Sequence, residues 1–584
     1  MNKNNEMKKL YLISLFLLSI LIFSCKENYE KNNFSVVIGL NSDPQALLPI
    51  KRNSDIERQV NQYIFIQAAD YDPFTLKNIP ILFEKLPQEV LVKDGLYKNT
   101  YRYDLKFRPE SKWENGSPIT AYDYLFTIKM ILIPGVEVHP ALRLLYSNIR
   151  NIEIDKNDDK KFSVYTTSDY LLSDELVTNM EIFPEYFYDS LKTMRTIPLT
   201  ALLANNNLDT FNTNNKTDFA TKINSAYFMR DHINGAGPYK LISWSPNNYI
   251  KLQKKQNWWG EDFKTIPYLN NNPDEIIYKI IADKNTALTE LKSGNIDVLS
   301  GELGNDFIKM KSDPIYKDKF SFYNPLSTQY YSLMINNRNP ILKEKSVRKA
   351  ISRLIDVDLL INTFGTGGER KTVSPIHPAK EYFNKSLKEV DFNVEEAKKI
   401  LVESGWKDSD GNGILDKVIN GRKSDLKISI TITGKAFGKS LAMQLKQNAE
   451  KAGINIDIVT QPNKSFKKAL DDLDFDLAPI IGSQDLADID PYSEWHSDNI
   501  QKGGSNVSGF ANEDCDKIID LIRTTRDKNK RNALYLDFQK ILYEEQPVVF
   551  LFIPTNNIIV SKKFTSEASI KRPGYFANTF KLAN

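Results

Sequence analysis

The order of apolar and polar positions predicts a chain that mixes strands and helices. Residues 34–40 (FSVVIGL) form a run rich in β-branched side chains, which is typical of a buried strand. Residues 101–107 alternate between apolar and polar positions, as a half-buried strand does. Residues 121–132 have helical periodicity, and Thr120 directly before them is a residue type that caps helix N-termini.

A second set of elements, in the C-terminal half, predicts a parallel sheet. Residues 426–432 (LKISITI) and 454–459 (INIDIV) have strand patterns, and residues 439–452 between them have a helix pattern. A strand, a helix and a strand joined by short turns form a βαβ unit, whose two strands are parallel. Further along, residues 531–545 are predicted to be helical, and residues 548–553 (VVFLFI) to form a fully apolar strand.

Two more segments complete the pattern. Apolar residues at helical spacing predict a helix over residues 346–361. They are Val347, Ala350, Ile351, Leu354 and Ile355. Residues 203–222 are rich in Asn, Thr and Asp, which predicts an exposed loop. Because 584 residues exceed what one hydrophobic core holds, we expect an α/β protein of two lobes.

The N-terminal segment has the layout of an export signal. Lysines precede an apolar run over residues 10–23, which is shorter than the roughly 20 residues that a membrane span needs. The run ends next to Cys25 in a segment that resembles a bacterial lipobox, where the cysteine becomes the lipidated N-terminus. We expect a lipoprotein signal peptide over residues 1–24 and a tether over residues 25–33. The alternative is an ordinary signal peptide with an incidental cysteine.

Charge and composition exclude several partners. The chain has 77 Lys and Arg against 74 Asp and Glu, a formal net charge of +3, and no clustered basic stripe. A protein that binds nucleic acid through phosphates needs a basic excess, so nucleic acid is not an expected partner. The four histidines lie far apart and lack metal-ligand spacing, and we expect no cofactor.

The two cysteines are not expected to form a disulfide. Lipidation would remove Cys25 from the pairing and leave Cys515 alone. Acidic neighbours surround Cys515, which disfavours its thiolate, and an inert buried thiol is the expectation. The chain also lacks G-x-S-x-G and H-E-x-x-H motifs, so no catalytic residues are predicted.

Two glycine-rich stretches resemble ligand loops only in part. Residues 434–440 lie where a phosphate-binding loop would, but three residues separate the glycines where the motif needs four. Residues 408–416 resemble the front of a calcium loop, with oxygen ligands at Asp408, Asp410, Asn412 and Asp416. The position of the bidentate Glu holds Ile419. We interpret the first as a strand-to-helix turn and the second as a turn with Asx hydrogen bonds, with calcium as the alternative.

Four motif stretches follow one another along the chain. They are WENGSPITAYD (113–123), NGAGPY (234–239) with NWWG (257–260), SGNID (293–297) with VRKA (347–350), and ADIDP (487–491) with GGSN (503–506). Together they resemble the family-five extracellular solute-binding proteins, the group that contains oligopeptide- and dipeptide-binding proteins. They cover most of the chain after the signal segment, and Ala236 stands where the family has Thr.

The resemblance implies a two-lobed, hinged fold of the type II periplasmic-binding-protein kind, with an extra insertion subdomain. Lobe I would be discontinuous and comprise residues 34–52, 201–300 and 550–584. The insertion subdomain would occupy residues 53–200, and lobe II residues 301–549. Closing both lobes over a ligand would shift the population toward the closed state.

The resemblance also implies a carboxylate for the ligand's ammonium group, just before the D-P pair. Asp488 is the implied residue, and Asp485 is its rival because this chain is one residue shorter before Pro491. Asp490 is expected to cap the turn before Pro491.

Three further side chains are implied near the ligand by the same resemblance. Trp495 and His496 are candidates to line the cleft, and Asn506 is expected to shape a loop beside it. For Trp495, a packed aromatic is the alternative.

These features predict a substrate-binding lipoprotein of an ABC importer. It would be a monomer that captures oligopeptides or dipeptides outside the cytoplasm and delivers them to a membrane permease. The anchor at Cys25 would hold it at the periplasmic or outer face of the membrane. The alternative within the fold is a non-peptide solute such as a nickel chelate, haem or an oligosaccharide, because ligand identity lies in the site. A secreted hydrolase is the alternative from another class.

Overall fold

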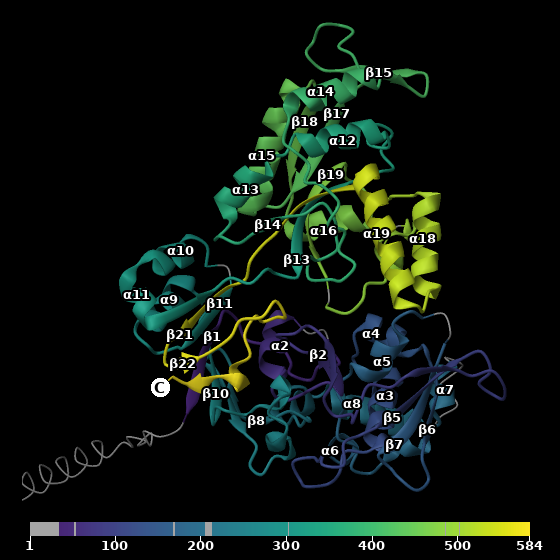
Figure 1. Ribbon diagram of the computed structural model, residues 1–584, viewed down its shortest axis with the longest axis vertical. Coiled ribbons are helices and arrows are strands. Elements are labelled where there is room, and N and C mark those ends of the chain that lie inside the picture. Colours follow the sequence, from purple (N-terminus) through teal and green to yellow (C-terminus); the bar gives the residue numbers. More distant parts are fainter. Residues whose placement is uncertain are drawn as a thin grey trace, which may run out of the picture.

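Two lobes and a subdomain build the molecule (Figure 1). The computed structural model describes residues 34–51, 54–167, 170–204, 213–301, 303–484, 486–501 and 503–583. The predicted signal peptide, the lipidation site Cys25 and the tether lie outside the described residues.

Lobe I is built on a seven-stranded mixed sheet. In spatial order its strands are β12 (Phe320–Tyr323), β21 (Asn557–Ser561), β11 (Val298–Gly301), β1 (Ser35–Leu40), β10 (Glu275–Ile280), β9 (Tyr249–Lys254) and β8 (Tyr239–Ser245). The predicted first strand is confirmed as β1, which pairs in parallel with both β10 and β11. Val36 and Ile38 of β1 are fully buried, as the β-branched run requires. Helices α9 (Lys284–Lys292), α10 (Asn305–Ser312) and α11 (Pro314–Lys319) lie beside this sheet (Figure 1).

Lobe II holds the second large sheet, of six strands. Their order is β14 (Arg370–Lys371), β20 (Val548–Ile553), β13 (Gln329–Ile335), β19 (Leu477–Ser483), β17 (Lys427–Ile432) and β18 (Asn455–Thr460). Helix α15 (Ala436–Lys451) follows β17 and precedes β18 in the chain, and the two strands pair with each other in parallel. The predicted βαβ unit is therefore confirmed. Its other larger helices are α12 (Lys345–Arg353), α13 (Val357–Phe364), α14 (Val394–Glu403), α16 (Asn463–Asp471), α18 (Glu513–Thr524) and α19 (Lys528–Glu545).

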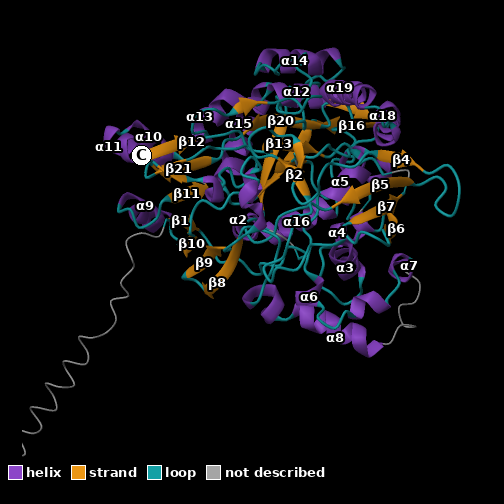
Figure 2. Ribbon diagram, turned by 60° about the horizontal axis from the view of Figure 1, so that its bottom comes forward, coloured by secondary structure: helices purple, strands orange, loops and turns teal. Residues whose placement is uncertain are grey.

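The insertion subdomain is a four-stranded antiparallel sheet with helices beside it. Its strands, in order, are β4 (Glu89–Leu91), β5 (Tyr101–Lys106), β7 (Lys161–Thr166) and β6 (Ile149–Ile154), and its helices are α3 (Ala121–Leu132), α4 (Pro140–Tyr146), α5 (Ser173–Thr178), α6 (Glu185–Tyr188), α7 (Leu199–Leu203) and α8 (Thr213–Asn224). Thr120 and Asp123 form the capping box that starts α3, which confirms the predicted helix. Helices α3, α6 and α8 lie at one end of the molecule in Figure 2, and α12, α14 and α19 of lobe II lie at the other end. One continuous hydrophobic core joins the subdomain to lobe I.

Two segment predictions need correction. The helix expected over residues 346–361 is two helices, α12 and α13, because the Asp356 carboxylate accepts from the Leu359 backbone N–H at 3.0 Å and starts a new helix. The exposed loop expected over residues 203–222 contains helix α8. Its few apolar side chains, including Phe219 and Ile223, are buried, and Phe219 packs edge-on against Phe126 of α3.

The two lobes are joined by two chain segments that run side by side. Residues 324–328 connect β12 to β13, and residues 554–556 connect β20 to β21. Leu326 and Thr555 form an antiparallel bridge, and the Ser327 N–H donates to the Pro554 carbonyl at 2.8 Å. Strand pairing therefore places the lobe boundaries in these two segments, after the predicted positions at 300 and 549. Two short connections that pair with each other form a hinge.

Candidate functional site

A cavity of about 630 Å³ lies between lobe II and the rest of the molecule. We call it the interlobe cavity. Its lining combines lobe II residues with lobe I, insertion-subdomain and C-terminal residues. They include Arg58, Gln67, Asp70, Tyr71, Tyr170, Glu175, Glu181, Tyr268, Thr328, Ser483, Gln484, Leu486, Ala487, Lys571 and Arg572. A volume of this size is within the range of small-molecule and cofactor sites.

Carboxylates are a prominent feature of the cavity wall. Asp70 comes from β2 (Ala69–Tyr71), Glu175 from α5, and Glu181 follows α5 after a short loop. The ammonium of Lys571 forms an ion pair with Asp70 at 2.5 Å and donates to the hydroxyl oxygen of Tyr268 at 2.6 Å. Asp70 is thus neutralised within the protein, while Glu175 and Glu181 form no ion pair with a lysine, arginine or histidine in the described part of the chain.

Glu175 has the most perturbed acidity of the three. The Tyr71 hydroxyl donates a hydrogen bond to its Oε1 atom. Burial raises the pKa of Glu175 to about 8, and the neighbouring carboxylates Asp174 and Asp488 act in the same direction, whereas hydrogen bonds to its carboxylate oppose them. A carboxyl group with a perturbed pKa in the wall of a cavity is typical of functional sites.

Glu181 has a related environment. Burial raises its pKa, and the negative charge of Asp70 adds to the effect. The side-chain amide of Gln67 donates to Glu181 at 3.4 Å and opposes the shift. The cavity therefore contains two carboxyl groups whose ionised form the protein itself stabilises poorly.

Positive charge gathers on another part of the wall. Arg58 and Arg572 both line the cavity, and both form ion pairs with Asp55, at 3.2 and 2.6 Å. Two guanidinium groups that share one carboxylate leave one positive charge unbalanced. Arginine binds carboxylates through two parallel N–H donors, so this part of the wall suits an anionic group.

Lobe II closes the cavity with the C-terminal end of β19. The strand pairs with β13 along its length, but with β17 only between Leu477 and Ile430, so most of its other edge has no partner strand among the described residues. Its end leads to Ser483 and Gln484 in the cavity wall. An unpaired strand edge can bind the backbone of an extended chain.

The implied ammonium ligand, Asp488, lies beside the cavity rather than in its wall. Leu486 and Ala487 line the cavity, and the Asp488 carboxylate forms an ion pair with Arg531 at 3.2 Å, in which both side chains are mostly buried. Asp485, the rival, lies outside the described residues. Asp490 accepts from the Tyr492 N–H at 3.0 Å, in the turn predicted for it, and pairs with Arg523.

The other three implied residues lie away from the cavity wall. Trp495 is 6% exposed and packs against Phe538 and Phe550, with ring centroids 6.1 Å apart. It belongs to the core of lobe II, so its placement in the cleft is corrected to the packed alternative.

His496 and Asn506 have local structural contacts instead of cavity contacts. His496 is buried, and its Nδ1 accepts from the Asp498 N–H at 3.1 Å. Asn506 is fully buried and donates to the carbonyls of His496 and Phe510. These bonds agree with the expected loop-shaping role of Asn506, but Asn506 does not line the cavity.

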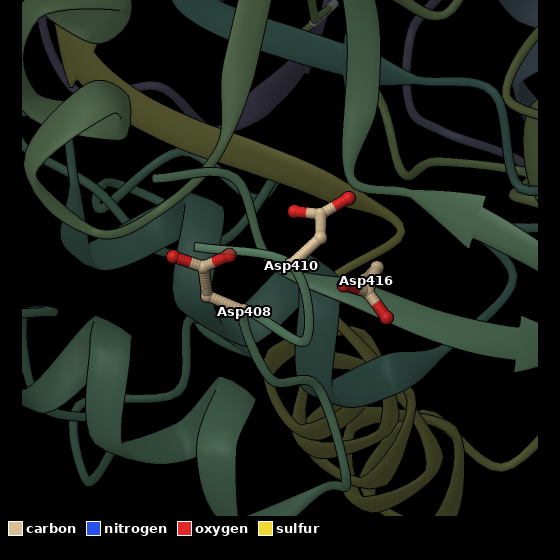
Figure 3. A group of neighbouring side chains, drawn as sticks. All are labelled: Asp408, Asp410 and Asp416. Carbon is tan, nitrogen blue, oxygen red and sulfur yellow. The ribbon is translucent and has the colours of Figure 1, made fainter. Parts of the chain in front are cut away.

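The acidic loop, residues 408–416, leads into β15 (Asp416–Ile419) at the end of lobe II that is farthest from lobe I (Figure 1). Carboxylate oxygens of Asp408, Asp410 and Asp416 come within 4.8 Å of one another (Figure 3). The ammonium of Lys423 lies 2.7 Å from Asp410 and 3.5 Å from Asp416 and balances part of this charge. The side-chain Oδ1 of Asn412 accepts from the Ile414 backbone N–H at 2.8 Å, as in an Asx turn. These contacts agree with the turn interpretation, and calcium binding stays an untested alternative.

Sequence reasoning missed Glu175, Glu181, Arg58 and Arg572. No motif or periodicity distinguishes Glu175 from the other acidic residues of the chain, because its environment depends on which segment faces it. Tyr71 lies 104 residues before it in the chain. The raised pKa of Glu175 and its place in the cavity wall are properties of the folded structure alone.

The described part of the chain contains no helix with the length and apolar character that crossing a bilayer requires.

Comparison with known proteins agrees with this architecture. The family described as bacterial extracellular solute-binding proteins, family 5 Middle, matches residues 93–504. Oligopeptide-binding protein AppA of Bacillus subtilis is 24% identical over 462 residues, which are 78% of this chain and 76% of AppA.

Solved structures share the fold. The structure of Bacillus subtilis AppA in complex with a nonapeptide has a TM-score of 0.66 and 21% identity, and the match covers 94% of this chain and 99% of AppA. NikZ from Campylobacter jejuni, solved in complex with Ni(L-His), has a TM-score of 0.64 and 21% identity, covering 91% of this chain and 95% of NikZ. The chain therefore belongs to the family 5 extracellular solute-binding proteins, and the predicted family and two-lobed α/β fold are confirmed. Members of this family bind substrates for ABC transporters outside the cytoplasm and are not catalysts.

Proposed function

We propose that this protein captures peptides in the interlobe cavity and delivers them to an ABC permease. The observation that carries the proposal is the wall of that cavity, which places unbalanced carboxyl groups, unbalanced guanidinium charge and an unpaired strand edge around one cavity. A peptide is complementary to all three, because it has an ammonium end, a carboxylate end and a hydrogen-bonding backbone.

The hinge supplies the mechanism. Two short segments, 324–328 and 554–556, connect the lobes and allow them to open and close. A ligand that contacts both walls binds the closed state better than the open one, so binding shifts the population toward closure. The permease would then distinguish loaded from empty protein by shape.

Membrane attachment at Cys25 is the second part of the proposal. The lipobox-like segment would place acyl chains at the N-terminus, and the polar tether would connect them to β1 in lobe I. The protein would act as a monomer at the periplasmic or outer face of the membrane. Mass spectrometry of the membrane-extracted protein would test this, because lipidation adds acyl mass to a chain that begins at Cys25.

Thermal unfolding of the chain that begins at Lys26 tests the ligand class. A ligand that binds only the folded state raises the melting temperature. At a free ligand concentration a hundred times the dissociation constant, it stabilises the folded state by about 2.7 kcal/mol. We expect a rise with a mixed peptide library and none with sugars or haem.

Ni(L-His) is the informative competitor, since NikZ was solved with it. A rise with that complex or another non-peptide solute and none with peptides would keep the solute-binding role and overturn the peptide proposal. No rise with any of these solutes, after refolding to remove a co-purified ligand, would contradict the transport role.

A further inference from the structure

We propose that lobe I docks on an anionic lipid surface through a patch of exposed lysines at the end of its sheet where β1 begins. The inference rests on the proposed attachment at Cys25, which would bring this end of the molecule to a membrane. It goes beyond attachment, because it states which face meets the bilayer and which lobe stays free to move. We call this face the lysine patch, and its members are Lys292, Lys317, Lys319, Lys562, Lys563 and Lys581.

Strand register brings three of these lysines together. Strands β1 and β11 are parallel, and β21 runs antiparallel to both β11 and β12, so β1, β11 and β12 begin at the end of the sheet where β21 ends. Lys319 directly precedes β12, and Lys562 and Lys563 directly follow β21. The Lys562 N–H donates to the Lys319 carbonyl at 2.8 Å, which holds the two segments side by side.

Two helices add two more lysines. Lys292 is the last residue of α9, and its ammonium lies 5.3 Å from the ring centroid of Tyr316 in α11. Lys317 lies in the last turn of α11, shortly before β12. The connections from α9 to β11 and from α11 to β12 are short, so both lysines lie near the end of the sheet where those strands begin.

The chain enters lobe I at the same end. The ring of Phe34, directly before β1, stacks on Phe564 of β22 (Phe564–Thr565), with centroids 5.7 Å apart. Strand β22 pairs with β23 (Lys581–Leu582), which adds Lys581 to the patch. The C-terminus, α11, β22 and β10 lie together at the end of lobe I that is away from lobe II (Figure 1). The tether therefore joins lobe I beside the patch.

The patch has an excess of positive charge. Lys563 forms an ion pair with the buried Asp297 at 3.1 Å, and the other five lysines form no ion pair in the described part of the chain. Two exposed acids, Asp318 and Glu567, adjoin the patch and offset part of its charge. The formal net charge of the whole chain is only +3, so the excess is a local property of this face.

An anionic bilayer is complementary to such a face. Each lysine near an anionic membrane surface favours the bound state by about fivefold, without requiring a fixed geometry from the lipid headgroups. Leu582, next to Lys581, is 60% exposed and adds an apolar side chain. The nine residues of the tether reach at most about 30 Å when extended, so a lipid at Cys25 would keep the patch close to the surface. Docking would then be an intramolecular step.

Docking through this patch would decide which lobe moves. The hinge segments, 324–328 and 554–556, leave the sheet of lobe I at the opposite end, after β12 and before β21. The hinge and lobe II would therefore point away from the bilayer. Lobe I would be the stationary lobe, and lobe II would open and close the interlobe cavity.

Lysine modification on vesicles tests the inference. The chain that begins at Cys25 is coupled through that thiol to a maleimide lipid, which replaces the natural anchor, while Cys515 is buried and does not compete. The vesicles contain phosphatidylcholine, with or without phosphatidylglycerol. We expect an amine-acetylating reagent, followed by mass spectrometry, to modify the patch lysines at least about fivefold more slowly on the anionic vesicles. Lys398, exposed in α14 of lobe II, should react equally on both, and high salt should remove the protection.

Two matched variants separate the patch from net charge. The control variant replaces three exposed lysines of lobe II, so both variants lose the same charge and should keep the parent's melting temperature. We expect the patch variant to lose the protection of its remaining patch lysines, and the control variant to keep it. The patch variant combines Lys319→Gln, Lys562→Gln and Lys581→Gln, and the control variant combines Lys385→Gln, Lys388→Gln and Lys398→Gln.

Vesicle flotation of the chain that begins at Lys26 tests the patch without any anchor. At low ionic strength we expect this chain to float with the anionic vesicles and not with phosphatidylcholine alone, because the attraction is electrostatic. The patch variant should float with neither kind of vesicle.

The outcomes separate the inference from the proposed attachment. Equal modification of the patch lysines on both kinds of vesicle would overturn the inference, and so would equal loss of protection in the two variants. If the membrane-extracted protein carries no lipid at Cys25, the proposed attachment fails. In that case, flotation with anionic vesicles alone would still support the patch as a lipid-binding face, and absence of flotation would refute it.

Discussion

The Arg526 guanidinium donates to the Leu171 carbonyl at 3.2 Å, a contact that bridges lobe II and the insertion subdomain. The same side chain donates to the Tyr170 carbonyl at 3.1 Å and lies 3.2 Å from Glu89. Tyr170 lines the interlobe cavity, so these bonds connect lobe II to the insertion subdomain beside that cavity. If the lobes move apart about the hinge, these bonds must break.

Replacing Arg526 should therefore weaken binding through closure. We expect Arg526→Ala to lower peptide affinity roughly tenfold, because hydrogen bonds of a charged donor stabilise the closed state by about 1.5–3 kcal/mol and this site is partly exposed. Calorimetry gives the affinity, and small-angle scattering gives the change in radius of gyration on binding.

Arg523→Ala is the matched control for this prediction. Arg523 is close in the chain but pairs with Asp490 inside lobe II, at 3.1 Å. The Arg523→Ala variant should bind peptide with nearly the parent's affinity. Equal losses in the two variants would show that Arg526 does not act through closure.

The second prediction concerns the close approach of Gly237 to the backbone of Tyr63 and Ile64. The Gly237 N–H donates to the Ile64 carbonyl at 2.8 Å, and a Cβ atom at Gly237 would lie 2.4 Å from the Tyr63 carbonyl oxygen. The added methyl group must move one of two packed backbones. We therefore expect Gly237→Ala to lower the free energy of unfolding, measured in urea, by about 1–3 kcal/mol.

Gly434→Ala provides the comparison, because a Cβ atom there meets nothing within 4 Å. Its stability should equal or slightly exceed that of the parent. Similar stability of both alanine variants would contradict the role assigned to the Gly237 contact.

The third prediction concerns His377 in lobe II. Its backbone N–H donates to the side-chain Oε1 of Gln484 in the cavity wall at 2.7 Å, and the residue is buried. Burial lowers the pKa of His377 to about 4, and the charges of Lys380 and Arg370 act in the same direction. The unfolded chain binds the proton near pH 6.5 and the folded chain only near pH 4, so stability falls as the pH drops through that interval.

The size of the effect follows from the two pKa values. Between pH 7 and pH 5, His377 should contribute a loss of roughly 2 kcal/mol in the free energy of unfolding. His377→Gln should reduce the parent's pH dependence by that amount in urea titrations at both pH values. Parallel pH profiles for variant and parent would refute the assignment.

The fourth prediction concerns Cys515 in α18. The thiol is fully buried, and burial raises its pKa to about 12, with a smaller contribution from Asp516. In the chain that begins at Lys26 it is the single cysteine, so maleimide labelling reports on it directly. We expect native protein at pH 7 to react at least about a hundredfold more slowly than protein unfolded in guanidinium chloride. Equal rates would mean that the thiol is accessible in the native state.

The sequence alone determined the family, the α/β class and most individual elements. Strand β1, helix α3 and the unit of β17, α15 and β18 follow from periodicities of two or 3.6 residues and from caps, which are properties of neighbouring residues. Where a neighbouring residue changed the outcome, as Asp356 did by starting α13, local chemistry was still the cause. The motif stretches identified the family because their order along the chain is itself information.

Only the tertiary structure decided which residues form the site. Glu175 meets Tyr71 from 104 residues away, and Arg526 meets Leu171 from 355 residues away. The motif near Pro491 pointed to Asp488, and only the fold brings Arg531 to neutralise it. Charge balance and burial depend on the summed fields of segments that close over one another, and such sums leave no periodic pattern in the chain. The elements are therefore encoded locally, whereas the charge and burial of the cavity wall arise from their assembly.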